Sequence, residues 1–168
     1  DNCVIKDCSV NGVYLHGESV FGSFTANTIS DCEEYPLVIP FLQATAVTSD
    51  NEISGIGICL TGENVGKKNG KVTVHEQTIP YVFGNGQWCF EINDNAEVTI
   101  EPGVTIAMPE DCFIRVGYST SGKLTAVGTE EKPITFTSNL TDKAAGDWDK
   151  IEFYEYASKS SALKNCHI

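Results

Sequence analysis

The chain has 168 residues, of which 41% are hydrophobic, and this composition fits one globular domain with a sizeable core. Asp and Glu together number 23 against 11 for Lys and Arg, so the formal net charge is -12, which would repel a nucleic-acid backbone or an anionic membrane surface. No apolar run approaches the length of a membrane span. We therefore predict neither a nucleic-acid partner nor membrane insertion.

Residues 1–60 repeat with a period of about 24 residues. The repeated positions are Ile5, Ile29 and Ile53, then Cys8, Cys32 and Ile56, and then Asn27 and Asn51. A repeat of this size, with inward Ile or Cys side chains at fixed places, predicts one solenoid coil per repeat. The short apolar runs 13–15 and 37–39 predict the next strand of the first two coils.

Asn27 and Asn51 each precede a strand at a predicted corner. They could form a polar site along one edge of the molecule. We favour a ladder, in which stacked amides bond to their neighbours at a turn position that suits Asn.

Residues 61–86 interrupt the repeat. The run 62–71 is polar and rich in Gly, so we expect a solvent-facing loop, and the strand-like residues after it predict an irregular or wider coil. In residues 87–92, Trp88, Phe90 and Ile92 alternate with Cys89 and Glu91. One of these two sets must face outward, because successive side chains of a strand point to opposite faces.

From residue 98 onward, short alternating strands recur between Gly and Pro turns. The first pass through three strands has apolar residues at Val98, Ile100, Val104, Ile106, Ile114 and Val116. The second pass has them at Leu124, Ala126, Ile134, Phe136, Ile151 and Phe153. Two turns of one triangular coil explain this order, and a coil of this kind buries its apolar side chains only by stacking on another coil.

These patterns predict an all-β chain that forms a right-handed, single-stranded parallel β-helix, a solenoid of triangular coils over residues 1–168 as one domain. Coils of about 24 residues would occupy residues 1–60, an irregular coil or loop residues 61–86, and further coils residues 87–168, with an insert at 139–149.

The seven cysteines are an odd number, and most of them lie in or beside the strand patterns. We predict that most are buried, reduced and core-filling. The spacing suggests that Cys8 stacks on Cys32, and Cys89 on Cys112, in adjacent coils.

Four segments resemble secreted bacterial right-handed β-helix proteins of the pectin-lyase-like superfold. They are EPGVTI (101–106), GKLTAVGTEEKPITFTS (122–138), GDWDKIEF (146–153) and SALKNCHI (161–168). The resemblance implies a secreted or cell-surface scaffold. It does not imply one activity, because this superfold hosts lyases, hydrolases, adhesins and phage fibres.

The enzymes of this superfold carry motifs that this chain lacks. Members that resemble polygalacturonases have N-T-D, D-D, G-H-G and R-I-K on neighbouring coils, and only His16-Gly17 matches part of this set. Lyase-type members use a basic residue, often Arg, assisted by calcium, and Arg115 is the only Arg here. Since Arg115 lies between Ile114 and Val116, we predict that it points outward and pairs with a stacked carboxylate, Glu91 or Glu152, in preference to a catalytic role.

Two sets of residues are candidates for ligand binding. Aromatic side chains can stack on sugar rings, and the predicted carbohydrate-binding residues are Trp88, Tyr118, Tyr154 and Tyr156 with Arg115. Carboxylates of the insert could hold calcium, and the predicted metal-binding residues are Asp142, Asp147 and Asp149. No other cofactor is predicted, since the three His residues have no zinc-ligand spacing.

Two functions follow from these observations. The preferred one is a non-catalytic extracellular or cell-surface β-helix module, an adhesin-like scaffold that binds polysaccharide. The alternative is a polysaccharide lyase or glycoside hydrolase that acts on an acidic or a plant or host glycan. A cleft with a paired acid and base would favour the enzyme, and a flat polar ladder would favour the scaffold.

The two ends of the chain repeat the same pattern, Asn-Cys-x-Ile, at residues 2–5 and 165–168. Neither end shows a polar segment that would cap the core of a solenoid. We therefore expect further β-helix coils, of the same or another chain, at both ends.

Overall fold

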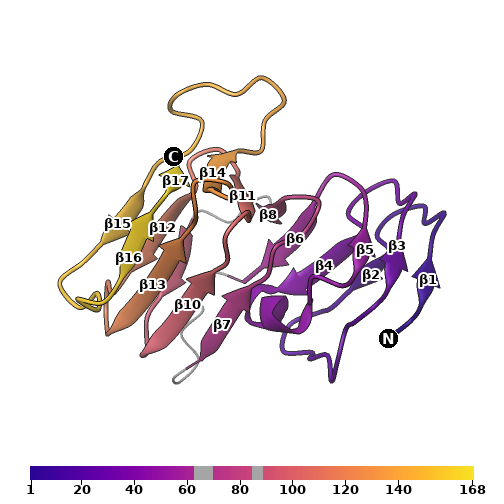
Figure 1. Cartoon of the computed structure of the whole chain (residues 1–168), viewed down its shortest axis with the longest axis horizontal. Helices are drawn as coiled ribbons and strands as arrows, with labels where there is room; N and C mark the ends of the chain where they lie inside the picture. Colours follow the sequence, from indigo (N-terminus) through magenta and orange to yellow (C-terminus); the bar gives the residue numbers. More distant parts are fainter. Residues whose placement is uncertain (63–69, 85–88) are drawn as a thin grey trace.

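The computed structural model describes residues 1–62, 70–84 and 89–168, and of residue 89 the backbone alone. The chain forms a right-handed parallel β-helix whose coils stack along the long axis of the molecule (Figure 1). Every strand pairing among the described residues is parallel. The predicted fold class is confirmed.

From β7 onward each coil contributes one strand to each of three faces. The first face contains β7 (Lys71–Val74), β10 (Ala96–Ile100), β13 (Gly122–Val127) and β16 (Ala162–Lys164). The second face runs through both halves of the molecule, with β2 (Val13–Tyr14), β4 (Leu37–Pro40), β6 (Ile58–Thr61), β8 (Tyr81–Phe83), β11 (Thr105–Met108), β14 (Ile134–Ser138) and β17 (Cys166–His167). The third face contains β9 (Cys89–Ile92), β12 (Phe113–Val116) and β15 (Ile151–Phe153).

In the N-terminal half, the first strand of each coil does not join the first face. There β1 (Val4–Ile5), β3 (Thr28–Ile29) and β5 (Glu52–Ile53) form a small sheet of their own. A 3-10 helix, η1 (Phe41–Ala46), follows β4 and packs against β7. No sequence pattern predicted this helix.

The register of the strands follows the apolar alternation. Val98 lies opposite both Val72 and Leu124, and Ile106 lies opposite Phe136. The inward side chains of these strands are almost fully buried. The predicted order of the two passes through residues 98–153 is therefore confirmed.

Three aromatic rings fill the interior where the two halves of the solenoid meet. Phe83 and Phe90 stack with their ring centroids 4.7 Å apart, and the Phe41 ring of η1 lies 4.1 Å from Phe90. Phe90 and Ile92 are thus the inward set of β9, which leaves Glu91 on the outer face. Large aromatic side chains bury much apolar area, so this cluster holds the N-terminal half of the solenoid on the C-terminal half.

Ile56 does not face the core as the repeat predicted, and 61% of it is exposed. In the second coil Ile29 and Leu37 are eight residues apart, whereas their partners Ile53 and Ile58 are five apart. The corner of the third coil is therefore three residues shorter, and it turns through Gly55 and Gly57, both with positive φ. Because this corner is shorter, Ile56 does not lie in the position of the third coil that is equivalent to that of Cys32 in the second.

The predicted stacking of Cys89 on Cys112 is also wrong. The register pairs Cys89 with Phe113, so the offset between these coils is 24 residues and not 23. Cys112 is buried, as predicted, while the side chain of Cys89 lies outside the described part of the chain.

The Asn ladder is present and buried. Asn51 Oδ1 accepts hydrogen bonds from Asn27 Nδ2 at 2.9 Å and from the Asn27 backbone N at 3.0 Å. Asn27 Oδ1 accepts from the backbone N of Cys3 at 3.1 Å, and Asn51 Nδ2 donates to the Phe24 carbonyl oxygen at 2.9 Å. The two amides thus satisfy backbone groups of three successive coils at one corner.

We predict that Asn27→Ala lowers the free energy of unfolding by about 1–3 kcal/mol, because buried backbone and amide groups lose their partners. Urea unfolding measures this change. Asn139→Ala is the matched control, since the Asn139 side chain makes no hydrogen bond to another described residue. Equal stability of the two variants would contradict a structural role for the ladder.

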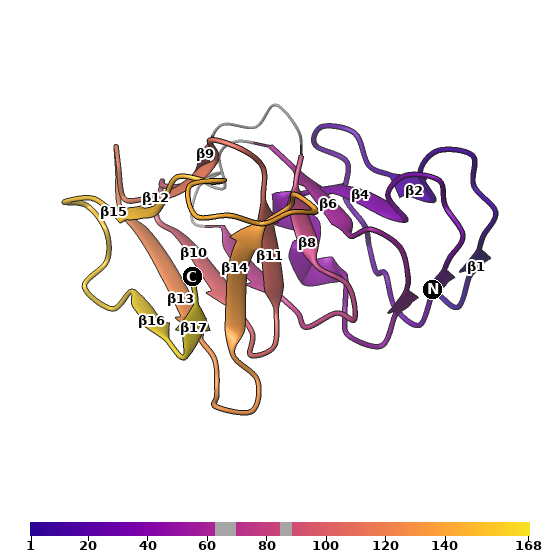
Figure 2. The same cartoon turned by 90° about the horizontal axis from the view of Figure 1, so that it is seen from above.

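The insert between β14 and β15 leaves the body of the solenoid as a long loop, and it shows as the orange loop above β14 in Figure 1. Figure 2 shows the same loop crossing over β14 and β11. The coils at both ends are less buried than those between them, with 72% of Val4 and 70% of Ile168 exposed. The predicted contacts with further coils stay a prediction.

Candidate functional site

The third face carries a ladder of charged side chains on its outer surface. The strand register places Arg115 opposite Glu91 on one side and Glu152 on the other. Ile114 and Val116, which flank Arg115, point into the core. Arg115 therefore faces outward, as the sequence predicted.

Arg115 pairs with Glu91, one of the two partners that the sequence suggested. Arg115 Nη1 donates to Glu91 Oε1 at 3.0 Å, and the exposed fractions of the two side chains are 21% and 20%. The other oxygen of Glu91 accepts from Asn93 Nδ2 at 3.1 Å. This half-buried pair fixes the guanidinium on the face more firmly than an exposed ion pair would.

Aromatic rings surround the guanidinium. Its Cζ atom lies 4.2 Å from the centroid of the Tyr118 ring, 4.7 Å from that of Phe113 and 5.5 Å from that of Tyr154. Tyr118 and Tyr154 meet edge to face with their centroids 4.8 Å apart. Cation–π contacts of this kind hold the rings in place, while 48% of Tyr118 remains exposed.

Glu152 completes the cluster on the side of the last strand. Its carboxylate accepts a hydrogen bond from the Tyr154 hydroxyl at 2.9 Å and lies 3.6 Å from Lys150 Nζ. The hydrogen bond to this carboxylate raises the pKa of Tyr154 above its usual value. Both carboxylates of the ladder thus have polar partners within the face. We call this group, Glu91, Phe113, Arg115, Tyr118, Lys150, Glu152 and Tyr154, the Arg115 face.

The structure brings together three of the five predicted carbohydrate-binding residues: Arg115, Tyr118 and Tyr154. Tyr156 is half exposed in the turn after β15 and makes no ring contact with the other described residues. Trp88 lies outside the described residues. The sequence prediction did not include Phe113 and Lys150. The strand register places these two residues opposite each other on the same face, so counting the residues between equivalent strands would have identified them.

The structure does not gather the three predicted metal-binding residues, Asp142, Asp147 and Asp149, into one group of ligands. In residues 1–62, 70–84 and 89–168 no group of three or more His, Cys, Asp or Glu side chains is placed to hold a metal ion. Asp147 accepts a hydrogen bond from the Ala144 backbone N at 2.8 Å, and this bond lowers the pKa of its carboxyl. Asp149 lies 3.9 Å from Lys150 Nζ. Hydrogen bonds within the loop and one ion pair thus account for two of the three carboxylates.

A cavity of about 550 Å³ lies beneath the insert, beside the Arg115 face. Its walls include Phe136, Ser138, Lys143, Trp148, Lys150 and Ile168. Lys150 lines the cavity and also belongs to the Arg115 face, so the two are adjacent. Trp148 packs against the core below the insert.

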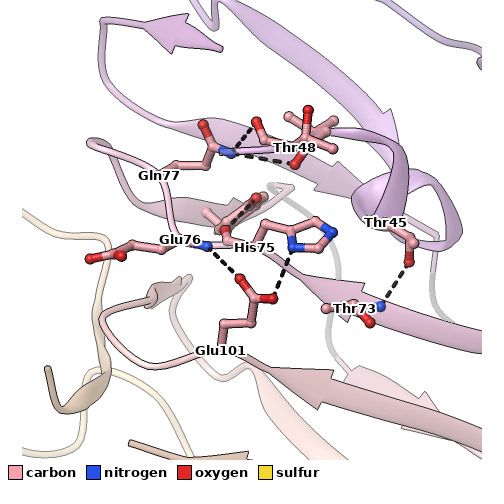
Figure 3. Close-up of polar contacts among 9 residues, drawn as sticks. Thr45, Thr48, Thr73, His75, Glu76, Gln77 and Glu101 are labelled. Carbon is pink, nitrogen blue, oxygen red and sulfur yellow. Dashed lines mark hydrogen bonds and ion pairs between the residues drawn. The ribbon is translucent and has the colours of Figure 1, made fainter. Parts of the chain in front are cut away.

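A second polar cluster lies at the corner between the first and second faces (Figure 3). His75 follows β7 and Glu101 follows β10, and His75 Nδ1 lies 3.0 Å from Glu101 Oε1. The other oxygen of Glu101 accepts from the backbone N of Glu76 at 3.4 Å. In Figure 3 the His75 and Glu101 side chains point toward each other, and the Glu76 side chain extends away from them.

This cluster connects coils one to the next. Gln77 Nε2 donates to the Thr48 carbonyl oxygen at 3.0 Å, and Thr73 N donates to Thr45 Oγ1 at 2.7 Å (Figure 3). These bonds tie the β7 coil to the N-terminal coils before it, and the His75–Glu101 contact ties it to the β10 coil. The arrangement therefore serves the structure, and the sequence did not predict it.

Glu76 reaches further than its neighbours. Its carboxylate pairs with Lys132 Nζ at 2.5 Å, and Lys132 belongs to the coil after the next one. The Glu76 side chain passes over Gly103 of the intervening coil, which has a φ of +88°. A Cβ on Gly103 would overlap the Glu76 carboxylate, so a larger residue there would displace the Glu76 side chain in addition to straining the backbone.

The fold and the outer face define the class of protein: a right-handed parallel β-helix that presents a ladder of charged and aromatic side chains. The family model described as "Pectate-lyase like beta helix domain" matches residues 66–158, more than half of the chain. The chain belongs to this family. No curated protein and no solved structure matches it.

Within the described residues, no helix has the length and apolar character that a membrane crossing requires.

We predict that Gly103→Ala destabilises the protein more than Gly146→Ala, by about 1 kcal/mol or less, because the Glu76 side chain must move aside and give up its exposed ion pair with Lys132. Both glycines have positive φ, +88° and +94°, but an added Cβ meets the Glu76 carboxylate only at Gly103 and nothing within 4 Å at Gly146. Chemical unfolding measures the free energy of unfolding of both variants. Because both substitutions strain the backbone, the difference between them reports the overlap with Glu76.

Glu76→Ala should cost less stability in the Gly103→Ala background than in the unsubstituted chain, because the added methyl group has already displaced the carboxylate from Lys132. Equal costs in the two backgrounds would show that Glu76 does not pass over Gly103 as the structure has it.

Proposed function

We propose that the chain is an extracellular or cell-surface β-helix module that binds carbohydrate on its Arg115 face without cleaving it. The observation that carries this proposal is the group of aromatic rings held around Arg115 on the outer surface of the third face. The family assignment supports a role near polysaccharides, since its description names pectate lyase.

The chemistry of the Arg115 face suits a sugar chain. An exposed tyrosine ring offers an apolar surface for the C–H groups of a sugar, and polar atoms at its edge can bond hydroxyl groups. Tyr118 is the most exposed ring of the group, and its contact with Arg115 limits its motion. A ring that is already held in place loses little conformational entropy when a ligand stacks on it.

The contacts of the charged residues favour binding over cleavage. Arg115 keeps its proton beside the Glu91 carboxylate and would not serve as a proton acceptor there. Glu91 accepts bonds from Arg115 and Asn93, and Glu152 contacts Tyr154 and Lys150. These carboxylates stabilise the ladder, whereas a glycosidase requires an acid and a base on opposite sides of a sugar.

We predict that Tyr118→Ala lowers the affinity for a bound oligosaccharide about tenfold, the effect of losing one stacked ring. A glycan array of plant, bacterial and host polysaccharides identifies the ligand, and calorimetry measures the dissociation constants. Tyr14→Ala is the matched control, because Tyr14 is 47% exposed and lies on the second face. An equal loss in both variants, or no binding to any glycan, would refute the proposed site.

A polysaccharide lyase is the second candidate, favoured by the family description alone. We predict no release of unsaturated uronate from polygalacturonate, with or without added calcium. A commercial pectate lyase serves as the positive control. Turnover that disappears in Arg115→Ala, in protein that remains folded by circular dichroism, would replace the binding proposal with the enzymatic one.

A further inference from the structure

The corners after β1 and β3 bring two cysteines together on adjacent coils. Cys8 and Cys32 lie opposite each other in an isolated parallel bridge. Backbone hydrogen bonds secure this bridge, from Cys8 N to Asp31 O at 3.2 Å and from Glu33 N to Cys8 O at 2.9 Å. Residues paired across parallel strands have Cα atoms about 4.8 Å apart, within the range that a disulfide spans.

The two corners have the same conformation. Asp7 and Asp31, directly before the two cysteines, have φ values of 56° and 54°. Each thiol lies near the carbonyl oxygen two residues before it, at 3.7 Å for Cys8 and 3.5 Å for Cys32. The two side chains therefore leave the backbone in the same direction, one coil apart.

Gly12 leaves room for the Cys32 thiol on the side of the first coil. A Cβ on Gly12 would lie 3.0 Å from Cys32 Sγ. Since Gly12 and Cys8 belong to the same coil, the Cys32 thiol extends toward the coil that carries Cys8. Burial, and then a hydrogen bond with the Cys8 thiol, raise the pKa of Cys32.

The other described cysteines have different partners in the register. Cys59 lies opposite Val38 and Val82, and Cys166 lies opposite Ile134. Among the described cysteines, the strand register thus places only Cys8 and Cys32 opposite each other.

We propose that Cys8 and Cys32 form a disulfide that cross-links the first two coils when the protein meets a disulfide oxidant such as oxidised glutathione. One cysteine thiolate attacks the oxidant, releases one glutathione and leaves a mixed disulfide. The second thiolate then attacks the protein sulfur and releases the other glutathione, so two thiols lose two protons and two electrons pass to the oxidant. The new bond anchors the coil that carries the exposed Val4.

The test treats the full chain with oxidised glutathione, alkylates the remaining thiols in denaturant and maps the disulfides by mass spectrometry. Chymotrypsin suits the map, because Tyr14, Phe21 and Phe24 lie between the two cysteines. We expect a linked Cys8–Cys32 peptide, two fewer free thiols than the seven of the reduced chain, and a higher melting temperature.

Cys8→Ser and Cys32→Ser should abolish both the link and the rise in melting temperature, and Cys3→Ser, the exposed neighbour, should keep both. The peptide map of the unsubstituted chain decides the matter even where a Ser variant fails to fold. Seven free thiols after oxidation, or links that join Cys3 between molecules, would overturn the proposal.

Discussion

Parallel stacking in register is the constraint on which the rest of this structure depends. Each strand bonds to the strand one coil before it and one coil after it, so every side chain has the equivalent side chains of two other coils as its nearest neighbours. Identical charges at equivalent positions would repel one another, and the chain alternates them. Glu97 lies between Lys71 and Lys123 on the first face, as Arg115 lies between two glutamates on the third.

The same constraint explains which parts of the fold could be predicted. Apolar alternation specifies which side chains point inward, and the matched runs of residues 98–153 specify the register, so the β-helix and its core followed from sequence. The Asn ladder followed because identical residues 24 apart, such as Asn27 and Asn51, stack directly. The lengths of the corners could not be predicted, because a corner with three residues fewer leaves the strands on both sides unchanged. Ile56 was misplaced for this reason, and Cys89 was paired one residue out of register.

The Arg115 face was only partly predictable. Alternation alone places Arg115 outside and identifies its two carboxylate neighbours, but the choice of Glu91 depends on side-chain geometry that a pattern does not contain. Tyr118 lies beyond the end of β12, and Gly117 with a φ of +68° directs the chain so that the ring returns over Arg115. His75 and Glu101 become visible in the sequence only once the offset of 26 residues between Val72 and Val98 is known.

The ion pair of Glu76 with Lys132 has a consequence for how the solenoid unfolds. A stack in which each coil contacts only its neighbours behaves as a one-dimensional chain, which can lose its units one at a time from either end. An ion pair that passes over a whole coil adds coupling between second neighbours, because the coil of Glu76 can leave the stack only after this contact with the coil of Lys132 breaks. The two side chains are 38% and 56% exposed, so the pair adds about 1 kcal/mol or less to the cooperativity of the three coils from β7 to β15.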